Sequence, residues 1–87
     1  MELKDLTDLV QKEMDFGLAK FGKYHSAHEQ YAVLKEECEE WWDAIKGNFA
    51  DCAHYELLQV AAVALRYIIE NGDAASIENV QRMRHNK

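Results

Sequence analysis

Two acidic segments in the sequence have carboxylates spaced for metal binding. Residues 36–40 read EECEE, and residues 56–59 read ELLQ within the most apolar stretch of the chain. In a helix successive residues turn by about 100°, so residues three apart project from neighbouring ridges. Two such helices lying side by side would bring three carboxylates and one amide together. These side chains are Glu37, Glu40, Glu56 and Gln59.

A cluster of carboxylates near a protein core usually faces a cation, because like charges raise one another's free energy when nothing neutralises them. A hard divalent ion with oxygen ligands is the usual solution. Mg²⁺ is therefore the expected cofactor, with Mn²⁺ as the alternative ion.

Length and composition narrow the class of protein. A chain of 87 residues forms one domain, residues 1–87, with a small core, so self-association is expected. The net charge of −6 argues against binding duplex nucleic acid or an anionic membrane, because both need an excess of Lys and Arg. Two cysteines are too few for a disulfide scaffold, and the N-terminus has no signal-peptide core. A cytoplasmic location is expected.

The pattern of apolar residues predicts an all-α fold. Proline is absent and only four glycines interrupt the chain. Helices are expected near residues 2–20, 26–46, 51–70 and 73–84. The second should begin with a capping box in which the Ser26 hydroxyl accepts from the Glu29 amide and the Glu29 carboxylate reaches back. Its predicted buried stripe is Leu34, Cys38, Trp41 and Ile45.

The third predicted helix is apolar nearly all round, which indicates the centre of an antiparallel helical bundle. We expect it to form a hairpin with the second helix, flanked by the first and fourth helices. A second copy would complete the bundle, giving a homodimer or homotetramer.

The two acidic segments and their flanking residues resemble the MazG-like all-alpha nucleoside triphosphate pyrophosphohydrolases, whose motif reads EExxE, a gap, then ExxD. Residues 26–34 (SAHEQYAVL) and 59–66 (QVAAVALR) are also similar to a compact bacterial and phage branch of that family. The resemblance covers roughly residues 22–70. It implies a Mg²⁺-dependent enzyme that cleaves between the α- and β-phosphates of a nucleotide, with Glu37, Glu40 and Glu56 as ligands. Gln59 departs from the motif, because it stands where the family has Asp.

Further site residues follow from the expected chemistry. Hydrolysis of the α–β bond needs an activated water and a cation that absorbs charge on the phosphate oxygens. Glu36 is the flanking acid left free to orient or deprotonate that water. Arg66 could contact a phosphate or pair with Glu70, four residues on. Candidates for contact with the rest of the substrate are His28 and Trp41, with Trp42 or Tyr31 as alternative stacking partners for a base.

Two other classes of function stay open. One is a catalytically degenerate MazG-like nucleotide-binding protein, because Gln59 removes a negative charge from the site. The other is a helical oligomerisation or adaptor module in which the acidic residues are incidental. A di-iron carboxylate bundle is disfavoured, since no Glu in the sequence has His three residues later.

Overall fold

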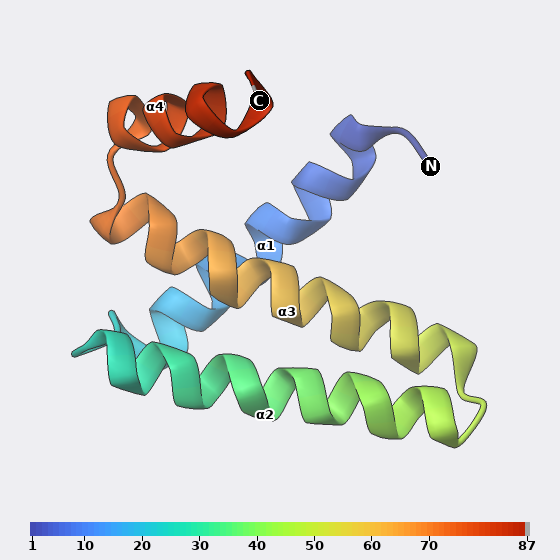
Figure 1. The fold of residues 1–87 in the computed structure, drawn as a ribbon. Helices are drawn as coiled ribbons and strands as arrows, with labels where there is room; N and C mark the ends of the chain where they lie inside the picture. Colours follow the sequence, from blue (N-terminus) through green and yellow to red (C-terminus); the bar gives the residue numbers. More distant parts are fainter. Residues whose placement is uncertain (87) are drawn as a thin grey trace.

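The computed structural model describes residues 1–86 and contains four helices, with no strand in that range. They are α1 (Leu3–Phe21), α2 (Ala27–Lys46), α3 (Ala50–Asn71) and α4 (Ala74–His85) (Figure 1). The all-α prediction is confirmed, and each helix begins and ends within one residue of its predicted bounds. None of the helices in the described range is long and apolar enough to cross a membrane.

The predicted start of α2 is confirmed in one of its two contacts. Ser26 accepts a 3.1 Å hydrogen bond from the Glu29 amide, which satisfies a free N–H of the first turn. The Glu29 carboxylate lies 3.0 Å from His25 Nδ1. It therefore pairs with the residue before the cap, whereas the predicted capping box has it reach back to Ser26.

Helix α3 is the centre of the structure, as its sequence predicts. It packs antiparallel against α2, to which a short turn at residues 47–49 connects it, and α1 crosses it (Figure 1). Within residues 1–86, α1 and α2 make no contact with each other. In this range, α1 is therefore held relative to α2 by α3 and by the residues that connect the two helices in sequence.

The core is small, as expected for this chain length. Val10 and Met14 of α1 pack against Ala62 of α3, with Leu58 and Ala61 partly buried around them. Large apolar side chains elsewhere on α1 and α3 are exposed, among them Leu6, Leu9, Leu57, Leu65 and Ile69. The described fold thus leaves much apolar surface in contact with water.

The predicted buried stripe of α2 is wrong in part. Cys38 is exposed and Ile45 is 38% exposed, whereas Ala44 is buried and Glu37 is half-buried. Within residues 1–86, α3 is the one helix that contacts α2, and α2 turns the ridge at positions 37, 41 and 44 toward it. Glu37, predicted at the edge of the stripe, therefore lies within the contact between α2 and α3.

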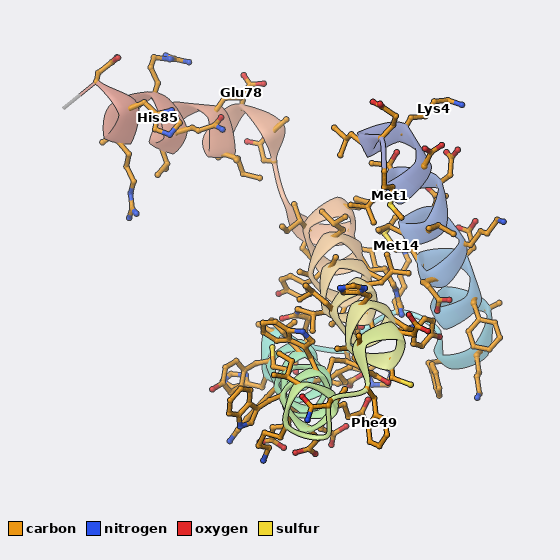
Figure 2. The ribbon with its side chains drawn as sticks, turned by 90° about the vertical axis from the view of Figure 1, so that its right-hand side faces the viewer. Met1, Lys4, Met14, Phe49, Glu78 and His85 are labelled. Atoms are coloured by element: carbon orange, nitrogen blue, oxygen red, sulfur yellow. The ribbon has the colours of Figure 1, made fainter. Side chains whose placement is uncertain are left out.

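The prediction that the fourth helix flanks the hairpin is also wrong. Helix α4 makes no contact with the other helices in residues 1–86, and Figure 2 shows it extending away from α1. Gly72 and Asp73 connect it to α3 in an extended conformation. Asp73 caps the new helix by accepting a hydrogen bond of 3.3 Å from the Ala75 amide.

Candidate metal centre

Three carboxylates converge where α2 and α3 pack together. Glu37 and Glu40 come from α2 and Glu56 from α3, and each offers an oxygen within 4.8 Å of the others. The spacing of three residues places the two α2 side chains on one side of the helix, and the antiparallel hairpin brings Glu56 opposite them. The convergence predicted from the two acidic segments is present in the structure for these three residues.

The electrostatics of Glu37 indicate an uncompensated acid. Burial raises the pKa of Glu37 to about 7 from its ordinary value of 4.5, and the neighbouring Glu40 and Glu56 carboxylates contribute to that rise. Its Oε2 atom is buried without a hydrogen-bond partner. A buried acceptor without a donor is costly, so this oxygen is suited to a cation or to its own proton.

Glu56 shows the same coupling from the opposite helix. Burial raises the pKa of the Glu56 carboxyl, as do a hydrogen bond to Glu40 and the charge on Glu40. The raised pKa means that the protonated form of Glu56 is favoured beside Glu40. A divalent cation would replace that proton and remove the repulsion among the three acids.

Gln59 makes its hydrogen bonds toward α1. Its Nε2 atom donates to Glu13 Oε2 at 2.5 Å and to the Tyr55 hydroxyl at 2.8 Å. Tyr55 also donates to Glu13, at 3.3 Å. Gln59 is therefore part of a polar contact between α3 and α1, and within the described residues its bonds do not join it to the three acids.

Glu36 and His28 are exposed. Glu36 is outside the group of three, although its charge contributes to the raised pKa of Glu37. His28 lies in the first turn of α2. Both side chains are free to meet a ligand from solvent, and neither belongs to the carboxylate cluster.

Arg66 is buried at 8% exposure and makes its contacts inside the protein. Its Nη2 atom donates to the Gly22 carbonyl at 2.5 Å and lies 3.9 Å from Glu70. The guanidinium stacks on the Tyr24 ring at 4.6 Å from its centre. The internal pair with Glu70, left open by the sequence, is present in the structure, while the Arg66 Nε atom is buried without a hydrogen-bond partner in the described residues.

Trp41 is half-buried and lines a pocket at the end of the hairpin where α2 meets α3. The pocket has a volume of about 450 Å³. Its other lining residues are Ala44, Ile45, Asn48, Phe49, Ala50, Ala53, His54 and Leu57. Trp41 directly follows Glu40, and Leu57 directly follows Glu56, so the pocket adjoins the carboxylate cluster along both helices.

Three residues near the site were not identified from the sequence. Tyr24 stacks on Arg66, and burial raises its pKa while the Arg66 charge lowers it. Glu13 and Tyr55 hold Gln59. These residues belong to no local motif. Glu13 and Tyr24 reach the site only because α1 and its following turn fold back onto α3.

Comparison of the chain with protein-family models, with curated proteins and with solved structures finds no match. The assignment of a function consequently depends on the geometry of the site and on the motif resemblance.

Proposed function

We propose that this protein is a Mg²⁺-dependent nucleoside triphosphate pyrophosphohydrolase that cleaves the α–β phosphate bond to give a nucleoside monophosphate and pyrophosphate. The observation that carries the proposal is the convergence of Glu37, Glu40 and Glu56 from two helices, with a buried Glu37 oxygen left unpartnered. The resemblance of the two acidic segments to the MazG-like motif supports the reaction.

The three carboxylates fit a hard cation because all their donors are oxygens and one oxygen, Glu37 Oε2, has no hydrogen-bond partner in residues 1–86. Bound there, Mg²⁺, or Mn²⁺ in its place, would neutralise charge on the phosphate oxygens and lower the pKa of a bound water. The role of Glu37, Glu40 and Glu56 is to hold the ion against the α2 and α3 contact. Glu36, exposed beside them, is free to orient the water or accept its proton.

The pocket beside the acids suits the nucleoside. Its volume of about 450 Å³ falls within the usual range for small-molecule sites. Its walls are mainly apolar, and the Trp41 ring offers a face on which a base could stack. Asn48 and His54 supply the polar groups that could select a base. His28 lies toward the other end of α2. Its contact with the phosphates of the substrate is part of this proposal.

A pyrophosphate-release assay tests the function. The protein is incubated with each ribo- and deoxyribonucleoside triphosphate in Mg²⁺ or Mn²⁺, and the products are separated. We expect monophosphate and pyrophosphate in equal amounts from at least one nucleotide. Diphosphate and orthophosphate as products would contradict α–β cleavage. Nucleotide binding without turnover would support the degenerate nucleotide-binding alternative.

A further inference from the structure

Helix α4 carries an apolar stripe of the kind that packs against another element, although no other helix of the described chain covers it. Ile77, Val80 and Met83 lie within about 120° of one another on its surface. They are 48%, 49% and 64% exposed. A free helix of 12 residues is marginal in water without tertiary packing. The apolar stripe of α4 therefore needs a partner.

A groove of matching character lies between α1 and α3. It has a volume of about 560 Å³, and its walls include Leu6 and Leu9 from α1 and Leu57 and Leu58 from α3. Leu6 and Leu9 are 40% exposed. The groove follows the N-terminal half of each helix, whereas α4 starts beyond the C-terminal end of α3. In Figure 2, α4 with Glu78 and His85 lies apart from α1 with Lys4 and Met14.

The solvent-accessible area of the chain is larger than that of a compact monomer of the same mass. A compact monomer of 10.1 kDa would expose about 5,300 Å², whereas this chain exposes 6974 Å². The excess of about 1,700 Å² is more than the roughly 800 Å² that each partner buries in an interface of standard size. It matches the area that one subunit buries in an obligate homodimer.

Charge separates α4 from the rest of the chain. Residues 1–73 carry fifteen Asp and Glu against seven Lys and Arg, whereas α4 carries Arg82 and Arg84 against Glu78 alone. Among the residues that line the groove itself, Glu13 and Lys12 are the charged ones, so its apolar character dominates. The net charge of α4 is therefore opposite in sign to that of the rest of the chain, which favours contact between α4 and a second copy.

The connection to α3 directs α4 outward. Gly72 leaves α3 so closely that a Cβ there would lie 2.6 Å from the Ile68 carbonyl oxygen. Asp73 then continues in an extended conformation, and its carboxylate accepts from Ala75 and Ser76, which starts α4 at once. These contacts start α4 after only two residues beyond the end of α3.

We propose that α4 of one copy docks in the α1/α3 groove of a second copy, so that two chains exchange their C-terminal helices in a symmetric dimer. Ile77, Val80 and Met83 would cover Leu6, Leu9 and Leu57 of the partner chain. The cationic last turn of α4 would lie against the net-acidic body of the partner chain. None of these residues belongs to the three-carboxylate cluster, although Leu57 also lines the pocket proposed for the nucleoside.

Paired variants of the full chain test the exchange. Ile77→Asp/Val80→Asp damages the helix and leaves the groove intact, and Leu6→Asp/Leu9→Asp does the reverse. We expect the parent to sediment as a dimer and each variant alone to have a dimer Kd at least about 100-fold higher, because docking would bury charge among apolar groups. An equimolar mixture should form a heterodimer, since one intact helix then meets one intact groove.

Ala75→Asp/His85→Asp is the matched control, because it adds two carboxylates on the side of α4 away from the apolar stripe. This variant should dimerise like the parent. The proposal is overturned if the parent is a monomer at tens of micromolar, which would leave α4 without a second copy. It is also overturned if the groove variant alone dimerises like the parent, or if mixing restores nothing.

A crosslinking experiment covers the case in which the Asp variants fail to fold. Cys38 and Cys52, both exposed, are first replaced by Ser. One chain then carries Val80→Cys, and a second, larger tagged chain carries Leu9→Cys. A short bismaleimide should join the two different chains. Crosslinking that is no greater than with Ala75→Cys in place of Val80→Cys would reject the docking.

Discussion

Gln59 on α3 donates a 2.5 Å hydrogen bond to the Glu13 carboxylate on α1. The contact joins the only two helices that share the apolar cluster of Val10, Met14 and Ala62 within the described chain. It also accounts for a neutral side chain at position 59. A second carboxylate there would face Glu13.

Gln59→Asp should therefore lower stability. We expect a loss of about 1 to 2 kcal/mol, because Asp would replace a donor with a charge of the same sign as Glu13. Adding Glu13→Gln should recover most of the loss, since the new amide can donate to the carboxylate introduced at position 59. Thermal melts of both single variants and the double variant give the coupling energy.

The same substitution tests whether Gln59 belongs to the metal site. From its contacts with Glu13 and Tyr55, the stabilisation of Gln59→Asp by Mg²⁺ should equal that of the parent. A clearly larger Mg²⁺-dependent rise in Tm would return Gln59 to the ligand set that the sequence predicts.

Mg²⁺ should raise the melting temperature of the parent, because a ligand that binds only the folded state stabilises it. Glu40→Gln or Glu56→Gln should abolish that rise, since each removes one of the converging carboxylates. Glu39→Gln is the matched control, because Glu39 is exposed and outside the cluster. Equal responses from all three variants would show that the ligand assignment is wrong.

Without metal, stability should fall as pH rises from about 4.5 to about 7. The folded-state pKa of Glu37 is raised to about 7 from 4.5, so the folded state binds more protons than the unfolded state across this window. The shift corresponds to roughly 3 kcal/mol. Solvent screening of a half-buried group reduces that to about 1 kcal/mol, or about 5 °C in Tm.

Glu37→Gln should remove most of this pH dependence, and Glu39→Gln should leave it intact. In the parent, Mg²⁺ should stabilise more at pH 8 than at pH 6, because the ion competes with the proton on Glu37. A melting temperature that rises with pH over this window in the absence of metal would argue against a buried, protonated Glu37.

The absence of a side chain at Gly17 leaves room for the Arg66 guanidinium. A Cβ at position 17 would lie 2.8 Å from the Arg66 Nη1 atom. Gly17→Ala should therefore cost about 1 kcal/mol despite the higher helix propensity of Ala. In an Arg66→Met background the same change should be stabilising. Denaturant titrations of the four proteins measure this reversal, and equal effects in both backgrounds would refute the contact.

The sequence predicts the parts of the fold that depend on local pattern. Glycines, caps and apolar periodicity place all four helices, because Ser26 and Asp73 act within a few residues of their own positions. The rotation of α2 about its axis is not local. It depends on which ridge meets α3, and for that reason Cys38 is exposed although the apolar pattern favours its burial.

The candidate site also has residues that local sequence predicts and residues that it does not. Glu37, Glu40 and Glu56 are predictable because helical spacing and an antiparallel hairpin suffice to bring them together. The contacts of Gln59 and Arg66 depend on α1 crossing α3, and no pattern in the sequence fixes that crossing. Glu13 and Tyr24 consequently become visible only in the assembled structure.

The most direct test of the central claim is pyrophosphate release by the parent, by Glu56→Gln and by Glu39→Gln, each with the nucleotide that the parent cleaves best. The three-carboxylate site predicts Mg²⁺-dependent release by the parent and by Glu39→Gln, and a fall of at least about 100-fold in Glu56→Gln. Release by Glu56→Gln at the parent rate, or the absence of release from every nucleotide, would contradict it.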